Sequence, residues 1–471
     1  MKFSPWGSIA VAVSFAVLVL AASSFLSSTS GDLLSRRLSI PRAANAAFLT
    51  AWLSRGDRDG DGEGGDRGVG GAGGGANPDD NPPPLGNRGA RAPKYFGSPS
   101  PSPSPSPARA PSPSPSPSPA PAPSLSPPPP RSCDIYSGRW VRDDGYPLFQ
   151  PSFCPFTDGA FQCQENGRND SGYLHWRWQP HSCDLPRFNA TDMMERLRNK
   201  TLAFVGDSLG RNQWESLVCM LYQAARNKRN VYEAHRQRVA KAGYYYSIVF
   251  ADHRVHIDFY RSHFLVAENR RLPDKIKSAA ANCTLSLDRL DPAAREWRSA
   301  DLIVFNSGHW WEHRSIHSGE CYFIQGSNYT TQMDGLAAFE TSMKTWARWI
   351  DRHIGRTQKI FVRGYSPNHF SGGDWDTGGS CESHLEPLAD EFKLDELSSK
   401  VAVFSRVLRS MKTRVTFLNV TKLSLFRKDG HVARWGKKHG WDQQDCSHWC
   451  LPGVPDTWNE LLYASLVKQQ Q

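Results

Sequence analysis

The chain has 471 residues, a formal net charge of +10 and a sequence pI near 9.1. Hydrophobic residues make up 39% of it, and most of its 16 tryptophans and 23 phenylalanines follow the first 130 residues, enough for the core of one large domain. The basic charge fits a soluble basic surface, an acidic polysaccharide, a membrane surface or nucleic acid. Because no zinc finger, RNA-binding signature or basic helix with heptads is present, we expect no nucleic-acid partner.

The first predicted element is a membrane anchor. The run from Trp6 to Leu26 is apolar or small throughout and carries no charge, and about 20 residues is membrane-spanning length. A signal peptide has a shorter apolar core of about 7–15 residues. We therefore expect an uncleaved signal anchor at 6–26 behind a short cytosolic tail at 1–5.

The next segment, residues 27–130, is rich in Gly, Pro and Ser. It shows no apolar periodicity and predicts a disordered stem. Its last part, 98–130, is nearly a Ser-Pro and Ala-Pro repeat, which favours polyproline II and reaches on the order of 100 Å at about 3.1 Å per residue. The simplest role for such a tract is a stalk that holds a domain away from the membrane.

The remaining residues, 131–471, form the predicted folded domain, and their chemistry indicates an oxidising compartment. All ten cysteines lie between Cys133 and Cys450, and an even number in a luminal chain is typical of a disulfide framework. Asn-x-Ser/Thr sequons support this location and mark candidate glycosylation sites at Asn169, Asn189, Asn199, Asn282, Asn328 and Asn419. We therefore expect this domain in the lumen.

Within that domain, residues 133–183 are rich in cysteine and aromatic residues and predict a disulfide-stapled lobe. Strands and helices then alternate, which predicts an α/β sandwich with a mainly parallel sheet. The predicted strands are 201–205, 247–250, 255–260, 302–305, 359–363 and 415–420. The predicted helices are 209–222, 333–353, 394–411 and 457–466.

Two short motifs carry the candidate chemistry. Gly206-Asp207-Ser208 ends a predicted strand and opens a predicted helix, a turn that exposes a serine hydroxyl beside free backbone N–H groups. Asp445 and His448 precede the closing helix, and with Ser208 they can form an acyl-transfer triad if the fold brings them together. Asn306 follows another predicted strand and is a candidate oxyanion donor.

Several neighbouring residues keep two interpretations each. Arg211 either contacts a polar ligand or pairs with an acid. Cys446 and Cys450 flank His448 and could ligate a metal, but disulfides are favoured in the lumen and no metal is expected. The histidines His309, His313 and His317 either form a ligand set or are surface and supporting groups around Trp310 and Trp311. The tryptophans Trp310, Trp311, Trp375 and Trp449 either stack on sugar rings or pack in the core.

Taken together, these motifs resemble the plant trichome birefringence-like family of polysaccharide O-acetyltransferases, within the SGNH/GDSL esterase superfamily. The resemblance covers about residues 133–468. Besides the triad motifs, it rests on Trp176-Arg177-Trp178-Gln179-Pro180, Cys183-Asp184-Leu185-Pro186-Arg187-Phe188, Phe204 through Asn212, Asn306 through Trp311, Gly372-Gly373-Asp374-Trp375 and Asp445 through Trp458.

The resemblance implies an SGNH-hydrolase-like three-layer sandwich, held in the Golgi membrane as a single-pass type II protein with a luminal catalytic domain. It implies that Ser208 accepts the acetyl group, His448 is the base and Asp445 orients it. It implies that Asn306 and the backbone N–H of Ser208 are oxyanion donors, with Gly210 as a further one.

The same resemblance implies a reaction and its partners. We expect transfer of acetyl groups to hydroxyls of a cell-wall polysaccharide, with xylan favoured and pectin a close rival. No bound cofactor is expected, and acetyl-CoA or a relayed acetyl carrier would be the co-substrate. A wall-polysaccharide acetylesterase and a non-catalytic, pectin-binding bridging protein remain as alternatives.

The resemblance also suggests how the cysteines pair, which spacing alone does not determine. Two of the suggested bonds would clamp the loop that carries Asp445 and His448. The suggested pairs are Cys133–Cys183, Cys154–Cys219, Cys163–Cys450 and Cys381–Cys446, with Cys283 and Cys321 left as a fifth pair.

Overall fold

The computed structural model describes residues 133–270, 283–388, 395–436 and 443–468, all within one compact unit of the chain. The predicted anchor at 6–26 and the predicted stem at 27–130 lie outside the described residues, as does the sequon at Asn282. Among the residues that are described, no helix combines the length and apolar character needed to cross a membrane.

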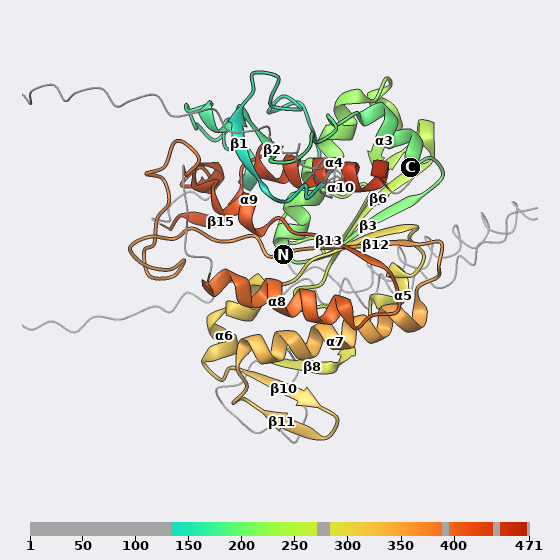
Figure 1. Cartoon of the computed structure of the whole chain (residues 1–471), viewed down its shortest axis with the longest axis vertical. Helices are drawn as coiled ribbons and strands as arrows, with labels where there is room; N and C mark the ends of the chain where they lie inside the picture. The colour runs from blue at the N-terminus through green and yellow to red at the C-terminus, as the bar shows by residue number, and fades with distance from the viewer. Residues whose placement is uncertain (1–132, 271–282, 389–394, 437–442, 469–471) are drawn as a thin grey trace, which may run out of the picture. The chain divides into compact units, whose positions relative to one another are not determined.

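A seven-stranded sheet forms the centre of the domain, in the order β13-β12-β9-β3-β6-β5-β4 (Figure 1). Its first five strands are parallel, β5 is antiparallel to β6, and β4 is antiparallel to β5. The sheet is therefore mixed but mostly parallel, and the predicted α/β class is confirmed. The strands in chain order are β3 (Thr201–Gly206), β4 (Val231–Glu233), β5 (Tyr245–Phe250), β6 (Val255–Arg261), β9 (Leu302–Phe305), β12 (Lys359–Arg363) and β13 (Val415–Leu418).

Helices cover both faces of this sheet, as Figure 1 shows. Phe204 and Val205 are neighbours on β3, so their side chains point to opposite faces. Phe204 belongs to one buried cluster together with Trp214, whereas Val205 belongs to a second cluster together with Trp346. Two cores on opposite sides of one sheet make three layers. The long helices are α4 (Ser208–Ala224) and α10 (Val454–Lys468) on the first side, and α7 (Gly335–His353) and α8 (Asp395–Arg409) on the second.

A second, four-stranded sheet packs against α7 and was not predicted from the sequence. Its short strands give little periodicity, but one signal was present. β10 and β11 are separated only by Gly326 and Ser327, and a Gly-Ser pair between two runs is a hairpin signal. Gly326 has a φ of +59°, which such a turn requires. The strands are β7 (Val266–Asn269), β8 (Cys283–Leu290), β10 (Cys321–Gln325) and β11 (Asn328–Thr330).

The N-terminal lobe is built on a small antiparallel pair, β1 (Gly138–Arg142) and β2 (Trp176–Pro180). The Cys133–Cys183 disulfide closes it. Trp140 joins the lobe to the rest of the domain, because its indole Nε1 donates to the carbonyl of Leu423 at 2.8 Å. The predicted disulfide-stapled lobe is therefore present.

Five disulfides join the same pairs that the resemblance suggests: Cys133–Cys183, Cys154–Cys219, Cys163–Cys450, Cys283–Cys321 and Cys381–Cys446. Two of them hold β15 (Asp445–Trp449), one at its second residue and one directly after its end. Bridges that close long loops each stabilise a fold by roughly 3–5 kcal/mol in the chain-entropy model. The strand that carries Asp445 and His448 is thus fastened at both ends.

The closing helix α10 is buried along most of its length and contains two buried acids. Ser216 Oγ donates to Asp456 Oδ1 at 2.6 Å, and Tyr146 Oη donates to Glu460 Oε1 at 2.6 Å. Burial raises the pKa of Asp456 to about 7 and that of Glu460 to about 8. Glu460 is therefore uncharged in the folded protein at neutral pH.

The raised pKa of Glu460 predicts that stability falls in mild alkali. A carboxyl with a raised folded-state pKa adds stability that is complete below its unfolded pKa of about 4.3 and is lost as pH rises through the folded value. Between about pH 7 and about pH 9 this group should cost about 1.4 kcal/mol of unfolding free energy. Glu460→Gln can still accept from Tyr146 but does not titrate. Urea unfolding at the two pH values should therefore show a drop in unfolding free energy that is smaller in this variant by about 1.4 kcal/mol. An equal loss in both proteins would contradict the prediction.

Candidate active site

Ser208 is placed by the turn between β3 and α4. Asp207 caps the helix, and its Oδ1 accepts from the amides of Leu209 at 3.0 Å and Gly210 at 3.4 Å. This cap makes Ser208 the first helical residue, where a helix leaves its amides without intrahelical partners. The Ser208 side chain is half-buried. The sequence motif thus folds locally as a strand-to-helix turn that presents a hydroxyl.

Strand β15 brings a histidine and a carboxylate to this turn. It pairs with β14 (His431–Ala433) in antiparallel fashion. His448 Nε2 lies 2.7 Å from Ser208 Oγ, and His448 Nδ1 lies 2.8 Å from Asp445 Oδ2. The three residues of the predicted triad therefore form one continuous hydrogen-bonded chain at the carboxyl end of β3.

The charge of Asp445 is fixed by its surroundings. Partial burial by itself would raise the pKa of this carboxyl, but the charge and hydrogen bonds of His448 and the amide of Ser447 outweigh it and hold the pKa well below its usual range. Asp445 Oδ1 accepts from the amides of Ser447 at 3.1 Å and His448 at 2.9 Å. An ionised Asp445 keeps the hydrogen on His448 Nδ1 and leaves Nε2 free to accept from Ser208.

The two other residues expected as oxyanion donors lie beside Ser208. Asn306 Nδ2 donates to Asp207 Oδ1 at 2.6 Å, which leaves its second amide hydrogen for another acceptor. Gly210 needs a correction, because its amide already donates to the Asp207 cap. Its glycine has a packing reason instead, since a Cβ there would lie 2.0 Å from Asn306 Oδ1. Ser208 and Asn306 therefore remain the candidate oxyanion donors.

Arg211 also needs a correction as a substrate-binding residue. Its side chain is buried, with a relative exposure of 3% for the residue. Its Nη1 donates to Asp158 Oδ2 at 2.9 Å and to the buried carboxylate of Glu215. Of the two interpretations, the structure supports pairing with acids. The network fastens the first turn of α4 to the N-terminal lobe.

The four candidate stacking tryptophans divide by burial. Trp311 and Trp449 have relative exposures of 1% and 0%. Each indole N–H donates to a serine, Trp311 to Ser307 at 2.9 Å and Trp449 to Ser366 at 3.0 Å. Neither offers a face to a ligand, so the expectation for Trp311 is wrong. Core packing explains both residues.

Trp310 and Trp375 instead belong to a stack of four rings. The ring centroids of His263 and Trp310 are 4.1 Å apart, those of Trp310 and His313 5.2 Å, and those of His313 and Trp375 5.4 Å, with nearly parallel planes. Trp375, at the outer end, has a relative exposure of 46%. We call these residues the ring stack. The histidines act here as packing partners of the tryptophans.

The ring stack begins beside the carboxyl ends of the strands, on the side of the sheet where Ser208 lies. The amide of Ser262 donates to the carbonyl of Gly206 at 2.7 Å, and Ser307 Oγ donates to the carbonyl of His263 at 3.1 Å. His263 therefore lies beside the ends of β3 and β9. From there the stack extends outward to Trp375.

One positioning residue was missed in the sequence. Asn212 Nδ2 donates to the carbonyl of Trp449 at 3.1 Å, and its Oδ1 accepts from the amide of Trp449 at 2.9 Å. Asn212 lies four residues after Ser208, on the same face of α4, and Trp449 directly follows His448. The spacing was a usable signal, but nothing in the sequence indicates Trp449 as its partner.

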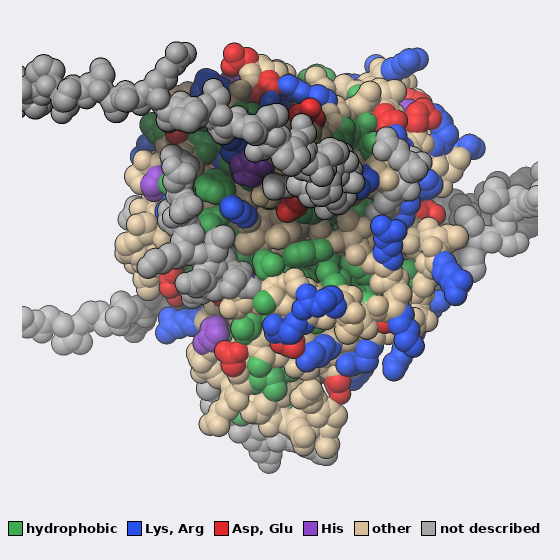
Figure 2. Space-filling model, in the orientation of Figure 1, with side chains coloured by type: hydrophobic (Ala, Val, Ile, Leu, Met, Phe, Trp, Pro, Cys, Tyr) green, Lys and Arg blue, Asp and Glu red, His purple; other side chains and the backbone are tan. Residues whose placement is uncertain are grey.

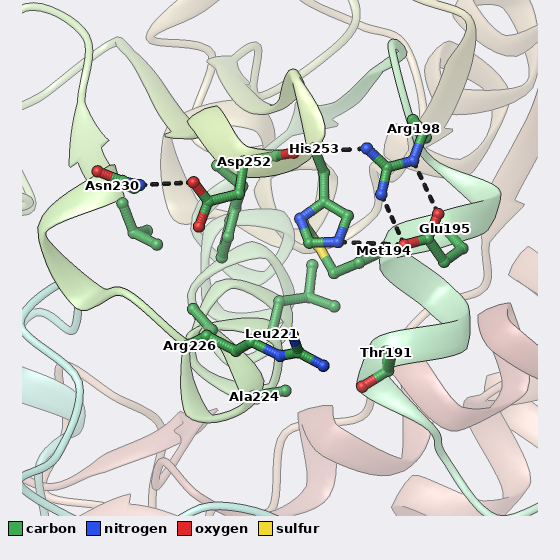
Figure 3. Close-up of a pocket in the computed structure, with 13 residues that line it drawn as sticks. Thr191, Met194, Glu195, Arg198, Leu221, Ala224, Arg226, Asn230, Asp252 and His253 are labelled. Atoms are coloured by element: carbon green, nitrogen blue, oxygen red, sulfur yellow. Dashed lines mark hydrogen bonds and ion pairs between the residues drawn. The ribbon is translucent and has the colours of Figure 1, made fainter.

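The described residues contain no group of three His, Cys, Asp or Glu side chains arranged to hold a metal ion. A cavity of about 390 Å³ lies elsewhere, between α3 (Ala190–Arg196), the end of α4 and the turn at Ala251–His253 (Figure 3). Leu221, the first residue of α4 that lines the cavity, is 13 residues after Ser208, or about 20 Å along the helix. The cavity is not part of the candidate active site.

Comparison with known proteins identifies the family. Residues 185–465 match the GDSL/SGNH-like acyl-esterase family found in Pmr5 and Cas1p, and residues 131–184 match the PMR5 N-terminal domain. Among proteins of Arabidopsis thaliana, the chain is similar to "Protein trichome birefringence-like 6" (43% identical over 343 residues), "Protein trichome birefringence-like 9" (44% over 354) and "Protein trichome birefringence" (42% over 346).

Each of these three matches covers 72% of this chain. They cover 71%, 84% and 56% of the relatives, so the chain spans little more than half of the last one. The acyl-esterase match extends over more than half of this chain and includes every residue of the hydrogen-bonded triad. The chain therefore belongs to the trichome birefringence-like family, within the GDSL/SGNH-like acyl-esterase superfamily.

Proposed function

We propose that this protein is an O-acetyltransferase that acts on cell-wall polysaccharides through an acetyl-serine at Ser208. The observation that carries the proposal is the contact chain from Asp445 through His448 to Ser208, with distances of 2.8 and 2.7 Å, in a member of an acyl-esterase family. A serine hydroxyl is a weak nucleophile until an adjacent base takes its proton. The chain of contacts supplies that base and its orienting partner.

The reaction has two half-steps. In the first, His448 Nε2 takes the Ser208 proton as Oγ attacks the acetyl carbonyl of the donor, and the leaving group departs with that proton. In the second, His448 takes the proton of a glycan hydroxyl as its oxygen attacks acetyl-Ser208, and Ser208 recovers a proton. The donor is acetyl-CoA or another acetyl carrier. Asp445 stabilises the imidazolium in both half-steps.

The oxyanion of each tetrahedral intermediate would be stabilised by two donors. One is the amide of Ser208 at the start of α4, where the helix dipole also favours negative charge. The other is the second amide hydrogen of Asn306, whose orientation is held by the bond to Asp207. A single donor of this kind is worth about 3–4 kcal/mol in the transition state.

The acceptor glycan would bind on the ring stack. Trp375 presents an exposed indole, and His313 packs on its other face with centroids 5.4 Å apart. This packing orders the ring before a ligand arrives, which lowers the entropy cost of binding. Because the stack starts beside the ends of β3 and β9, a glycan on Trp375 can extend toward Ser208.

Among acceptors we propose xylan, with pectin as the rival. One argument for pectin is the basic charge of the chain. Many exposed Arg and Lys side chains gather over α5 (Ala294–Trp297) and the ends of α7 and α8 (Figure 2). These residues come just before the amino ends of β9, β12 and β13, whereas Ser208 follows the carboxyl end of β3. They therefore lie at the opposite end of the parallel strands from Ser208. They are Arg295, Arg298, Arg352, Arg356, Arg409, Lys412 and Arg414. The basic charge there does not favour an acidic acceptor at the triad.

A wall-polysaccharide acetylesterase is the second candidate, and one observation favours it. The side chains of His448 and Asp445 have relative exposures of 22% and 36%, so water reaches the triad. Water in place of the glycan hydroxyl would hydrolyse the acetyl-serine. A non-catalytic bridging protein would need only the ring stack, and a reactive Ser208 would exclude it.

The first prediction of this proposed function tests the triad. Ser208→Ala and His448→Ala should each abolish acetyl transfer, and the double variant should be barely worse than either, because triad members act as one unit. The measurement is the incorporation of labelled acetyl into glycan, together with mass spectrometry of the Ser208 peptide. His353→Ala, at an exposed position, is the matched control. Turnover by folded Ser208→Ala would rule out Ser208 as the nucleophile.

The second prediction tests acceptor and platform together. Deacetylated xylan should accept labelled acetyl faster than pectin or mannan. Trp375→Ala should raise KM for xylan about tenfold, as expected from losing about 1.4 kcal/mol of stacking, while cleavage of a small acetyl ester stays unchanged. Tyr232→Ala is the control, since Tyr232 is similarly exposed at 48% but lies on β4, a peripheral strand. An unchanged KM for Trp375→Ala would refute the platform.

The third prediction concerns location. The five disulfides fit the secretory pathway, and we propose a Golgi protein anchored by residues 6–26 with the domain in the lumen. The protein should stay in membranes after alkaline carbonate extraction, and glycosidase treatment should increase its gel mobility. Glycopeptides should include the exposed sequons and omit Asn419, which is half-buried with a buried, unpartnered Oδ1. The exposed ones are Asn169, Asn189, Asn199 and Asn328. A soluble, unglycosylated product would contradict this location.

A further inference from the structure

Two buried histidines lie directly behind the triad and were not singled out in the sequence. His369 and His431 have relative exposures of 7% and 1%. His369 Nδ1 lies 2.6 Å from His431 Nε2, so the two rings are hydrogen-bonded to each other. Neither ring touches Ser208. Any role in the reaction must therefore act through other residues.

Both histidines contact the strand that carries His448. The amide of His369 donates to the carbonyl of Cys446 at 3.0 Å. His431 Nδ1 lies 2.9 Å from the carbonyl of His448. The His431 ring also stacks on Trp449, with centroids 3.9 Å apart. The pair therefore supports the residues before, at and after the candidate base.

A count of hydrogens limits what the pair can do. The pair makes three contacts. His369 Nε2 lies 3.0 Å from the carbonyl of Leu425, His369 Nδ1 contacts His431 Nε2, and His431 Nδ1 contacts the carbonyl of His448. Carbonyls only accept, so the two outer contacts each need an N–H, and the central contact needs a third. Two neutral imidazoles carry only two hydrogens. A neutral pair that keeps the hydrogen bond between its rings can therefore bond to the carbonyl of His448 or to that of Leu425, but not to both at once.

The surroundings oppose an extra proton. Burial lowers the pKa of His369 to about 4, assisted by the charges of Lys428 and His384. Burial, with the neighbouring His369, also holds the pKa of His431 well below its usual range, although Asp445 and the carbonyl of His448 act in the other direction.

The remaining charged groups around the pair are already engaged. Arg168 faces the backbone rather than the ring of His431, donating to its carbonyl at 3.3 Å. Asp429 is held by Arg427 at 2.9 Å. Neither group supplies a counter-ion to the imidazoles. The pair is therefore neutral at neutral pH.

We propose that His369 and His431 form a neutral positioning pair that holds the candidate base by its main chain, with the hydrogen on Nδ1 of both rings. In this arrangement His369 Nδ1–H donates to His431 Nε2, and His431 Nδ1–H donates to the carbonyl of His448. The role in catalysis rests on the function proposed above, whereas the hydrogen placement does not. The opposite arrangement, with the hydrogens on both Nε2 atoms, would release the carbonyl of His448.

The arrangement has a consequence for acid conditions. Protonation of the pair would supply the third hydrogen and complete the contact to Leu425, so it would not release His448. It would also place a positive charge behind Asp445 and His448. Because the folded protein resists this protonation while unfolded histidines titrate near pH 6.5, the pair should lose stability as pH falls from about 6.5 toward about 4.

The hydrogen placement is testable without any activity. The full-length protein, labelled with ¹⁵N-histidine in detergent, should give His369 and His431 signals of neutral rings that carry hydrogen on Nδ1, at about pH 7. The signals are assigned by their loss in His369→Asn and His431→Asn. Hydrogen on Nε2 of either ring at this pH, or a charged pair, would overturn the proposal. Either result leaves the proposed reaction of Ser208 standing.

Two substitutions at one position test the positioning role. In His431→Asn the side-chain amide can take the place of Nδ1–H and still donate to the carbonyl of His448, whereas His431→Leu cannot. Since a misplacement of about 1 Å can cost on the order of a hundredfold in rate, we expect His431→Leu to slow acetylation of Ser208 by about ten- to a hundredfold, with KM for xylan unchanged. His431→Asn should recover most of the rate.

Folding is checked in both variants by circular dichroism and by intact disulfides. Equal rates for folded wild type, His431→Leu and His431→Asn would refute the positioning role. If His431→Leu does not fold, His369→Leu still decides, because loss of the donor to His431 Nε2 should slow Ser208 acetylation by about tenfold with KM for xylan unchanged, and an unchanged rate would refute the positioning role. A wild-type protein whose Ser208 never becomes acetylated would instead contradict the proposed function, and the ¹⁵N spectrum would then decide the pair separately.

Discussion

The two hydrogen bonds between Asn212 and Trp449 are the contact on which the candidate site depends. They join helix α4 to strand β15 across 237 residues of sequence, with lengths of 3.1 and 2.9 Å. Ser208 lies one helical turn before Asn212, and His448 directly precedes Trp449. Because one amide holds both the N–H and the C=O of the same residue, it fixes the position and the direction of β15. The Ser208–His448 distance follows from that geometry.

Around this contact the protein holds each partner of the triad from a different direction. The disulfides of Cys446 and Cys450 hold β15 at its start and just beyond its end. The bond from Asn306 to Asp207 joins the ends of β9 and β3. Such restraints matter because catalysis by a preformed site depends on donors and bases that need no rearrangement during the reaction. Buried polar groups are costly when unpaired, and the pairing of Asn306 Nδ2 with Asp207 Oδ1 therefore favours one geometry.

The sequence predicted the parts that depend on local chain properties. Apolar runs located six of the seven strands of the central sheet, all but the three-residue β4, and Gly206-Asp207-Ser208 located the turn, because both are set by neighbouring residues. Contacts between distant residues were not predictable in this way. Nothing in the spacing shows that Arg211 points into the lobe, that Trp311 is buried while Trp310 is not, or that His369 meets His431. Burial and partners of this kind depend on how elements pack, which one sequence does not reveal.

The exposed triad also bears on the choice between transfer and hydrolysis. Water reaches His448, so the triad itself cannot exclude it. Water need not be excluded from the triad if the acceptor hydroxyl is held in place. Water is present at about 55 M, whereas a well-oriented bound hydroxyl reaches an effective concentration on the order of 10⁵ M or more. An acceptor ordered by the ring stack would then win by a factor on the order of 10³. With the acceptor absent or misplaced, the same triad would hydrolyse its acetyl-serine. The difference between a transferase and an esterase in this fold would therefore lie in Trp375 and its supporting rings, not in Ser208, His448 or Asp445.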